Sequence, residues 1–587
     1  MIRLGQRRLN KVDLQEVSNL LPEMTQFLPI YLSNSQSRQK YYASFFREDV
    51  NLELVKIESH EKVLGFLSLL IEGKTLLLTN LLVPAHKNSR KYGLDFWLKH
   101  VEKLAKEELC ERLQLNLAPV NGYIKNLLVA KGYSFQVTSG GDWQFTKRLN
   151  YRRGLVLAGG GARGAFQIGA WRGLQELGIT YDLICGTSVG GLNGGLILQG
   201  DYQAAEKMWR EIETKQILDF ETVAEEVDYS PVTLLKTIQR FTFSALVKQG
   251  VSTAPLQKLI EELIDEEKMM NSEKEFYICT TELPHLKERV VSIKDSLPGE
   301  FHKWLLASSS FFPAMAAAEI AGKYYVDGGY RNNIPIDVAL NQGATELLVI
   351  DVKGPGITKP VLVPAEVPIK WVSSPWNLGA VLLFDGARSH WNIELGYLET
   401  LKAYGVYEGY WYSFTKEDQS SRQGEWQKQF NGLLMKELQV RGKHVAKTEL
   451  PTYLKELLKK IRKTYSHDLK AESVSLFVLE YLGKAFNLSP IQLYSVESFS
   501  QEICVKMKKS QTELVTGNKM LLTLPEWSRL YLEELPLPTE KQQILYLYHK
   551  IKGEQRENLF HVMANIAPLP YLAALVLNHL LGNKDEK

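Results

Sequence analysis

Two short apolar segments, residues 154–158 and 182–185, each run directly into a glycine-rich turn that opens a helical pattern. Their length and composition are typical of buried strands. Strands that alternate with helices predict a mostly parallel sheet covered by helices on both faces. Residues 276–280 and 346–351 have the pattern of further strands in that sheet. We therefore expect a three-layer α/β domain in the middle of the chain.

The length of the chain predicts more than one domain. Hydrophobic cores stop growing at roughly 250–300 residues, and this chain has 587. We expect a first α/β domain at residues 1–150, the central α/β domain at residues 151–415, and a helical C-terminal region at residues 416–587.

Charge and cysteine usage narrow the class of protein. A formal net charge of +3 creates no strong field, so nucleic acid is not an expected partner. The four cysteines lie far apart in the sequence, which excludes a CxxC metal motif and suits a reducing compartment. The N-terminus lacks the apolar stretch of a signal peptide. We expect a cytoplasmic protein without a metal or cofactor that makes transient, peripheral contact with the inner membrane surface.

Two C-terminal segments bear on membrane contact. Residues 560–582 carry no formal charge, but they include Pro568, Pro570 and Asn578. A buried helix is therefore expected in preference to a membrane span. Residues 451–470 form a basic amphipathic pattern. A docked helix with a solvated basic face is expected there, and transient contact with anionic lipid is the alternative.

Ser188 lies directly after the second apolar segment, in a Gly-Thr-Ser-Val-Gly sequence that begins at Gly186 and ends at Gly190. A serine that attacks an acyl group must stand clear of its own backbone, on a sharp turn between a strand and a helix. Flanking glycines permit such a turn because they carry no Cβ atom. The motif alone is common; its position between a strand and a helix indicates a nucleophile.

The glycine-rich turn at residues 159–164 has two interpretations. Its sequence, GGGARG, matches the G-x-G-x-x-G pattern of dinucleotide-binding folds. That pattern expects an acidic residue at the end of the next strand, whereas Asp182 precedes its strand. Alternatively, consecutive amides at a helix N-terminus stabilise the negative oxygen of a tetrahedral intermediate. The groups of that oxyanion site would be Gly159, Gly160, Gly161 and the positively charged Arg163.

Asp327, followed by Gly328 and Gly329, comes after an expected strand at residues 323–326. An Asp-Gly pair between two short strands is a common hairpin turn. A nucleophilic serine also needs a base, and none of the histidines after Ser188 lies in a strand-then-loop context. Asp327 can be that base if its carboxylate contacts the serine hydroxyl directly.

In this order, the glycine-rich loop, the serine turn and Asp-Gly-Gly resemble the patatin-like phospholipase family over about residues 153–351, supported by residues 307–313 and 324–335. The resemblance implies a lipase or phospholipase A type of activity, in which a Ser–Asp dyad hydrolyses fatty-acyl esters of phospholipids and related membrane lipids without metal. It assigns Ser188 as the nucleophile and Asp327 as the base. It assigns the oxyanion site to Gly159, Gly160, Gly161 and Arg163, and its motif glycines are Gly164, Gly186, Gly190, Gly328 and Gly329.

The first 150 residues resemble the GNAT acetyltransferase superfamily. The acyl-CoA loop of that superfamily matches residues 90–95, but Asp95 places a negative charge where phosphates would approach. A later signature aligns with residues 121–133, where Leu128 stands at the position that usually supplies a tyrosine acid. The resemblance implies a degenerate accessory domain. An active acetyltransferase is the alternative, and weak acyl-CoA binding stays open.

Three functional hypotheses follow. In the main one, Ser188 attacks a lipid ester, Asp327 takes its proton, and water activated by Asp327 then releases the fatty acid. In the second, an α/β-hydrolase-type esterase uses a histidine base, although Ala158 precedes the glycines where such enzymes usually carry histidine. In the third, the chain is a nucleotide- or acyl-CoA-binding regulatory protein.

Overall fold

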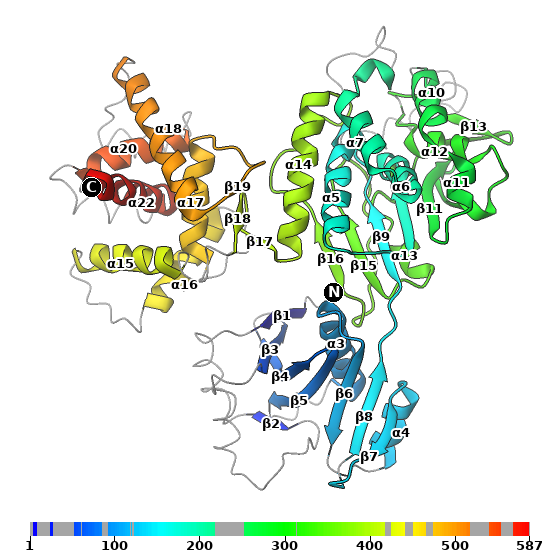
Figure 1. Ribbon diagram of the computed structural model, residues 1–587, viewed down its shortest axis with the longest axis horizontal. Coiled ribbons are helices and arrows are strands. Elements are labelled where there is room, and N and C mark those ends of the chain that lie inside the picture. Colours follow the sequence, from blue (N-terminus) through cyan, green and yellow to red (C-terminus); the bar gives the residue numbers. More distant parts are fainter. Residues whose placement is uncertain are drawn as a thin grey trace.

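The computed structural model has three lobes (Figure 1). The N-terminal lobe is built on one sheet, the central lobe on a second sheet with many helices, and the C-terminal lobe on helices. The structure describes residues 4–8, 24–26, 52–59, 62–84, 92–117, 119, 122–141, 143–217, 252–312, 314–416, 424–440, 450–464, 473–516, 539–552 and 567–585.

An eight-stranded sheet forms the N-terminal lobe, in the order β1-β3-β4-β5-β6-β8-β7 with β2 beside β5. Strands β5 and β6 run parallel, and the other described pairs are antiparallel. Helix α3 packs on the sheet because Leu98, Val101 and Leu104 recur at helical spacing. The elements are β1 (Leu4–Arg8), β2 (Met24–Gln26), β3 (Leu52–Ser59), β4 (Lys62–Glu72), β5 (Thr75–Pro84), α3 (Leu94–Glu107), β6 (Arg112–Leu117), α4 (Gly122–Ala130), β7 (Ser134–Val137) and β8 (Trp143–Arg148).

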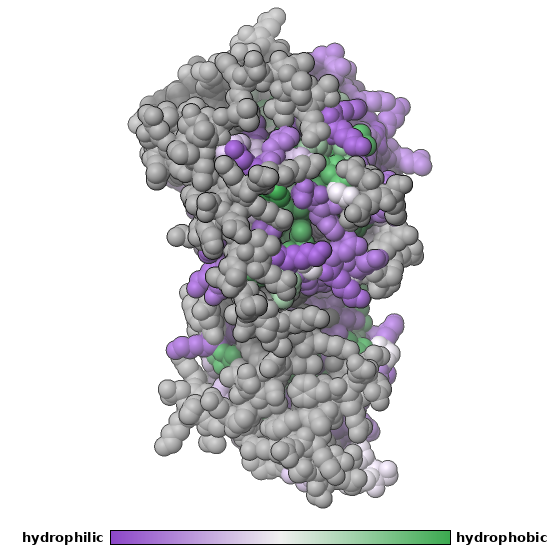
Figure 2. All heavy atoms as spheres, turned by 90° about the vertical axis from the view of Figure 1, so that its left-hand side faces the viewer, coloured by the Kyte–Doolittle hydropathy of each residue, from purple (hydrophilic) through white to green (hydrophobic). Residues whose placement is uncertain are grey.

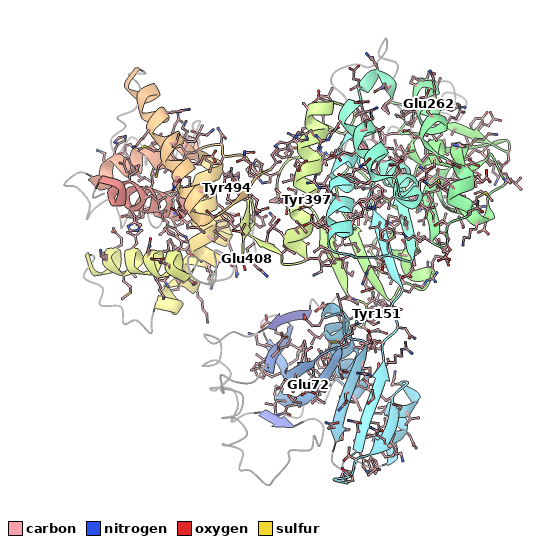
Figure 3. All side chains as sticks on the ribbon, in the orientation of Figure 1. Glu72, Tyr151, Glu262, Tyr397, Glu408 and Tyr494 are labelled. Atoms are coloured by element: carbon pink, nitrogen blue, oxygen red, sulfur yellow. The ribbon has the colours of Figure 1, made fainter. Side chains whose placement is uncertain are left out.

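Tyr151 lies where the N-terminal lobe passes into the central lobe (Figure 3). Its hydroxyl donates to the backbone oxygen of Cys110 at 2.5 Å. From α3, the buried Lys106 ammonium reaches the backbone oxygen of Thr345 in the central lobe at 3.4 Å. These polar contacts join the N-terminal lobe to the segment that enters the central lobe and to the residue that precedes its strand at Glu346–Ile350.

The central lobe contains a second eight-stranded sheet and the helices around it. Its strands are β9 (Arg153–Leu157), β10 (Leu183–Thr187), β11 (Glu275–Glu282), β12 (Lys287–Ser292), β13 (Ala318–Ile320), β14 (Lys323–Asp327), β15 (Glu346–Ile350) and β16 (Ile369–Val372). Its α-helices are α5 (Ala165–Glu176), α6 (Val189–Gln199), α7 (Tyr202–Glu211), α10 (Ala254–Leu263), α11 (Glu266–Met270), α12 (Phe301–Ser309), α13 (Ile336–Asn341) and α14 (Gly386–Ala403). Its short 3₁₀ helices are η3 (Gly161–Gly164), η4 (Thr214–Gln216), η6 (Ile293–Asp295) and η7 (Gly328–Tyr330).

The order of this sheet is β13-β14-β11-β10-β9-β15-β16, with β12 beside β11. Strands β11, β10, β9, β15 and β16 are parallel, and β12, β13 and β14 are antiparallel. The predicted α/β fold with a mostly parallel central sheet is confirmed. In such sheets, sites form beyond the carboxyl ends of the parallel strands. The glycine-rich loop follows β9 and Ser188 follows β10, so both lie at that edge.

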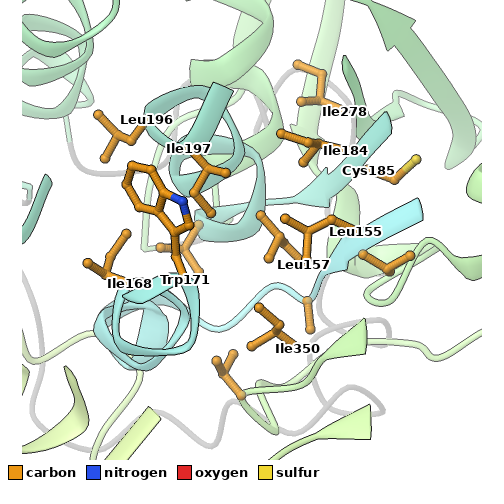
Figure 4. Close-up of a cluster of buried hydrophobic side chains, with 14 of the residues drawn as sticks. Leu155, Leu157, Ile168, Trp171, Ile184, Cys185, Leu196, Ile197, Ile278 and Ile350 are labelled. Atoms are coloured by element: carbon orange, nitrogen blue, oxygen red, sulfur yellow. The ribbon is translucent and has the colours of Figure 1, made fainter. Parts of the chain in front are cut away.

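The core of the central lobe lies between the sheet and helices α5 and α6 (Figure 4). Leu155 and Leu157 are separated by one residue on β9, so both face these helices, together with Ile184 of β10. All three side chains are fully buried. Their burial fixes β9 and β10, and with them the turns that follow each strand.

Helices α5 and α14 approach each other almost to backbone contact. A Cβ atom on Gly169 would lie 1.8 Å from the backbone oxygen of Ile393, and one on Gly396 would lie 2.0 Å from that of Phe166. Glycine is therefore required at both crossing points. This tight crossing anchors α14 and the loop that precedes it beside the carboxyl edge of the sheet.

The C-terminal lobe has its own hydrophobic core, which begins at Trp411 and includes Phe414. A small three-stranded sheet, ordered β17-β18-β19, links it to the central lobe. The strands are β17 (Tyr407–Glu408), β18 (Ser413–Thr415) and β19 (Leu493–Tyr494). The helices are α15 (Gly424–Val440), α16 (Leu450–Thr464), α17 (Val474–Ala485), α18 (Val496–Thr516), α20 (Glu540–Lys552) and α22 (Pro568–Asp585).

Helices α22 and α16 match the predicted buried and docked helices. Leu572 and Val576 of α22 are buried in the C-terminal core, and residues 560–566 lie outside the described part. In α16, Leu457 and Ile461 are buried while Lys455 and the other described basic side chains are exposed. Within the described residues, no helix combines the length and apolar character needed to cross a bilayer. Hydrophilic residues predominate among the described atoms on the face shown in Figure 2.

Candidate active site

Ser188 stands on the predicted sharp turn between β10 and α6. Its backbone has φ 56° and ψ −128°, a conformation that few non-glycine residues adopt. A Cβ atom on Gly186 would lie 2.3 Å from the backbone oxygen of Gly190, and one on Gly190 would lie 2.2 Å from that of Leu157. Both glycines are therefore required by close backbone approach, as the sequence predicted.

The hydroxyl of Ser188 donates a hydrogen bond to Oδ2 of Asp327 at 2.5 Å. The two residues are 139 positions apart in the sequence, and both are buried. The structure thus brings together the two side chains that the sequence singled out. A carboxylate at this distance can accept the hydroxyl proton directly, without a histidine between them.

Asp327 ends strand β14 and is held by two further hydrogen bonds. Its backbone amide donates to the backbone oxygen of Ser310 at 2.9 Å, and its Oδ1 accepts from the amide of Gly329 at 2.7 Å. A 3₁₀ helix, η7, follows it in place of the hairpin turn that an Asp-Gly pair commonly forms. The Asp-Gly-Gly sequence therefore serves to orient a carboxylate, and Gly328 is needed because its Cβ would lie 2.2 Å from the backbone oxygen of Cys279.

Burial raises the pKa of Asp327 to about 6, and the hydrogen bonds from the Ser188 hydroxyl and the Gly329 amide offset part of that rise. A general base works best when its pKa lies near the operating pH. Asp327 is therefore a stronger base than an exposed aspartate and is still largely ionised at neutral pH.

The glycine-rich loop provides fewer oxyanion donors than the sequence predicted. The amide of Gly159 already donates to the backbone oxygen of Asn333 at 3.0 Å, so it is not available. The amides of Gly160 and Gly161 have no hydrogen bond acceptor among the described residues, and both glycines line the pocket that holds Ser188. The geometry leaves these two amides as the candidate donors.

Arg163 has a different place from the one expected. Its Nε donates to the backbone oxygen of Gly379 at 2.8 Å, and its guanidinium also donates to that of Lys353. Arg163 is not among the residues that line the pocket. Its guanidinium thus ties the glycine-rich loop to two neighbouring loops, because a charged donor forms strong hydrogen bonds with carbonyl oxygens.

An apolar pocket of about 850 Å³, including its open mouth, extends from Ser188 between α6, α7 and α10. Its polar groups lie at one end, with Ser188 and Asp327, and its walls are apolar side chains such as Leu196, Trp209 and Ile260. A pocket that is apolar except for a few converging polar groups is typical of a site for a largely hydrophobic ligand.

Histidine is absent from the described residues that line this pocket. His302 instead contacts Glu266 through Nδ1 at 2.6 Å, and His390 contacts Arg210 and Glu394 on α7 and α14. The described geometry therefore gives no support to the histidine-base hypothesis.

The sequence did not identify the role of three consecutive serines at the end of α12. The hydroxyl of Ser308 accepts from the amide of Ser188 at 2.9 Å and donates to the backbone oxygen of Cys279 at 2.7 Å. It ties the strained nucleophile turn to strand β11. The available signal was the run Ser308-Ser309-Ser310 itself, three small polar residues at the end of an otherwise apolar helix.

The structure shows the surroundings of the two residues in the N-terminal lobe that depart from the acetyltransferase pattern. Leu128 is fully buried in the core of the lobe. Asp95 contacts Lys131 and lies 3.7 Å from Lys99, and the hydrogen bond from Lys131 holds the pKa of Asp95 below its ordinary value. Arg90 and Lys91 of the predicted acyl-CoA loop lie outside the described residues.

Sequence relatives match the central lobe. Patatin-like phospholipase domain-containing protein 7 of Rattus norvegicus is 29% identical over 198 residues, which cover 34% of this chain and 13% of the relative. Neuropathy target esterase sws of Drosophila melanogaster is 29% identical, with 34% of this chain and 13% of the relative covered. Lysophospholipase NTE1 of Mycosarcoma maydis is 27% identical over 38% of this chain and 11% of the relative. The matched region thus spans a small part of each relative's length.

Solved structures with similarity to this chain include PaiA N-acetyltransferase from Thermoplasma acidophilum, at 18% identity and a TM-score of 0.20, covering 25% of this chain and 100% of that one. VipD from Legionella pneumophila covers 76% of this chain and 94% of its own, at 11% identity and a TM-score of 0.29. Similarity at this level supports no conclusion about activity.

The family description "Patatin-like phospholipase" matches residues 155–340. This range begins in β9, ahead of the glycine-rich loop, and ends in α13, so it contains Ser188, Asp327 and most of the sheet that positions them. Residues 155–340 of this chain therefore form a patatin-like phospholipase domain.

Proposed function

We propose that this protein is a serine acyl hydrolase that cleaves fatty-acyl esters of lipids. The observation that carries the proposal is the 2.5 Å hydrogen bond from the Ser188 hydroxyl to Asp327, at the polar end of an apolar pocket. The patatin-like domain supports a lipid substrate, since related proteins are named as phospholipases and a lysophospholipase.

In this mechanism, Ser188 Oγ attacks the ester carbonyl carbon while Asp327 accepts the hydroxyl proton. The negative oxygen that forms is stabilised by the amides of Gly160 and Gly161. As the C–O bond breaks, Asp327 returns the proton to the departing alcohol. Water then attacks the acyl-enzyme, gives a proton to Asp327, and releases the fatty acid as Ser188 recovers its hydrogen.

The direct test is hydrolysis of a soluble p-nitrophenyl ester by the full chain, together with covalent labelling by a fluorophosphonate probe. We expect both, because the probe reports an activated serine independently of the substrate. Labelling that is absent under conditions where the protein is folded would contradict the proposal and favour a ligand-binding protein without hydrolase activity.

The pH dependence of kcat/KM should follow the ionisation of Asp327. A protonated Asp327 cannot accept the proton of Ser188, so activity falls as the pH drops through about 6 and levels off above about 7. The measurement is kcat/KM on a soluble ester between pH 5 and pH 8, with circular dichroism at each pH to verify folding. A profile that is flat through pH 6 would exclude Asp327 as the titrating base.

We also propose that the protein works in the cytoplasm and contacts the inner membrane surface through the exposed basic face of α16. Four basic side chains lie on this face: Lys455, Lys459, Lys460 and Arg462. Such residues are attracted to anionic headgroups, each by about 1 kcal/mol near the surface. The apolar face of α16 is buried in the C-terminal core, so the expected contact is electrostatic.

Sedimentation with phosphatidylcholine vesicles that contain phosphatidylserine should weaken with salt. The double variant Lys455→Glu, Lys459→Glu should lower the partition coefficient by about tenfold or more. The matched variant Lys74→Glu, Lys323→Glu changes two exposed lysines in the other lobes and should retain most of the binding. Equal losses in the two variants would remove α16 as the contact surface.

We propose that the chain consists of three domains. The N-terminal and central cores are separate, and their junction at Tyr151 supports a boundary near residue 150. The C-terminal core begins at Trp411, which supports a second boundary slightly before the expected residue 415. The burial of Leu128 and the pairing of Asp95 support an accessory role for the N-terminal domain in place of acetyl transfer.

A further inference from the structure

Ser309, the last residue of α12, carries a buried hydroxyl with no hydrogen bond partner among the described residues. The residue is 6% exposed, and it lines the same pocket as Ser188 and Asp327. A buried hydroxyl without a partner is costly and uncommon in folded proteins. A hydroxyl of this kind at the wall of a ligand pocket indicates that the ligand supplies the missing partner.

The two neighbouring serines are already committed to the protein. Ser308 Oγ binds the amide of Ser188, and Ser310 Oγ donates to the backbone oxygen of Leu306 at 2.8 Å. The backbone oxygen of Ser310 also accepts the amide of Asp327. The residues on both sides of Ser309 are thus hydrogen-bonded to the two proposed catalytic residues, and Ser309 lines the same pocket as they do.

Two other polar side chains that line the pocket, Asn193 and Asn333, are hydrogen-bonded within the protein. The remaining polar groups have partners in the proposed mechanism. The amides of Gly160 and Gly161 face the oxyanion, Asp327 exchanges its proton with the departing oxygen, and the apolar walls surround the acyl chain. The alcohol portion of the ester must lie near Asp327, because it takes its proton from that carboxyl group. No group has yet been assigned to it, and Ser309 is on the segment that holds Asp327.

We propose that Ser309 is a substrate-binding residue whose Oγ forms a hydrogen bond with a free hydroxyl on the alcohol portion of the ester. This inference rests on the proposed hydrolase function and narrows its substrates to esters of polyols, such as glycerol, in preference to esters of simple alcohols. A pocket that hydrogen-bonds a substrate hydroxyl discriminates against the analogue that lacks it.

The test compares 1-monooleoylglycerol with n-propyl oleate, which share the acyl chain and differ by two hydroxyls. Both are presented to the full-length protein in detergent micelles at equal mole fraction. Ser309→Ala should lower kcat/KM for the glycerol ester by about tenfold, mainly through a higher KM, because one hydrogen bond is lost. For the propyl ester the change should stay within about twofold.

Ser310→Ala is the matched control, since it removes a neighbouring hydroxyl that is bonded within the protein. It should affect both esters by the same factor. An equal loss on both esters in Ser309→Ala, or no loss on either, would overturn the assignment of Ser309. Hydrolysis of n-propyl oleate that depends on Ser188 upholds the hydrolase function whatever Ser309 does. Failure of the unchanged protein on both esters would overturn the hydrolase function and the assignment of Ser309 together.

Discussion

Ser188→Ala is expected to remove ester hydrolysis by the full chain, by a factor of about 10⁵ or more, while the fold stays intact. Among the described residues, Ser188 combines a φ of 56° with a hydroxyl that donates directly to a buried carboxylate. Alanine keeps the Cβ atom and carries no larger penalty than serine at this backbone angle. The change therefore removes the nucleophile and its hydrogen bond to Asp327, and leaves the backbone of the turn in place.

Two measurements check this expectation. The first is kcat/KM on a soluble ester, and the second is fluorophosphonate labelling followed by peptide mass spectrometry to locate the adduct. Ser296→Ala is a suitable control, because the Ser296 hydroxyl donates to the backbone oxygen of Ser292 and lies outside the pocket. It should retain near-native activity and labelling. An adduct that persists in Ser188→Ala would show that another residue is the nucleophile.

Local sequence was sufficient to predict the elements that position the site. The apolar segments before residues 159 and 186 became β9 and β10, and the helical stretch after the first turn became α5. Ser188 could be predicted because the requirement for glycine at 186 and 190 is local. Each glycine contacts backbone within the same strand–turn–helix unit or the adjacent strand. Such short-range constraints can be recognised from the local sequence pattern.

The oxyanion donors could not be predicted at the level of single residues. Whether a backbone amide is free to bind the oxyanion depends on hydrogen bond acceptors that the fold brings close from distant parts of the chain. The acceptor for Gly159 is Asn333, which lies 174 positions along the chain. Arg163 was predicted beside the oxyanion on charge alone, but the backbone oxygens that bind its guanidinium belong to loops about 190 and 216 positions away. Long-range hydrogen bonds of this kind leave no local pattern.

The serine run at the end of α12 was also beyond sequence reasoning. Three adjacent serines look equivalent in the sequence, yet each has a different environment. Ser308 supports the nucleophile turn, Ser310 binds within its own helix and supports Asp327, and Ser309 faces the pocket. The partners are set by the packing of α12 against β11 and α6, which a single sequence does not specify.

Asp327→Asn is expected to lower kcat/KM for ester hydrolysis by about 10²- to 10⁴-fold, the range that follows the loss of a general base. Asparagine keeps the shape of the side chain, and its amide oxygen can still accept from the amide of Gly329, as Oδ1 of Asp327 does at 2.7 Å. The group that faces Ser188 Oγ cannot accept a full proton. The loss should therefore appear in the chemical step, and the fall in activity near pH 6 should disappear in the variant.

The stability of Asp327→Asn separates loss of the base from loss of the fold. Burial raises the pKa of Asp327 to about 6, above its value in the unfolded chain. Protonation of Asp327 therefore favours folding, and that contribution is lost as the pH rises through about 6. At pH 7 the native protein holds a buried charge that the asparagine variant lacks, so the variant should melt at the same temperature or higher. A large drop in its melting temperature would mean that the lost activity reports misfolding.

Matched variants decide between the carboxylate and a histidine as the base. Asp201→Asn is the control for the chemical change. Asp201 caps α7 by accepting the amide of Ala204 at 3.0 Å, and asparagine caps a helix equally well. This variant should therefore remain active.

His302→Ala and His390→Ala remove histidines that contact other parts of the central lobe, and both variants should retain most activity. Near-native kcat/KM in Asp327→Asn would exclude the carboxylate as the base. A collapse of activity in either folded histidine variant would reinstate the histidine mechanism, because Ser188 would then need a base that the 2.5 Å contact with Asp327 does not provide.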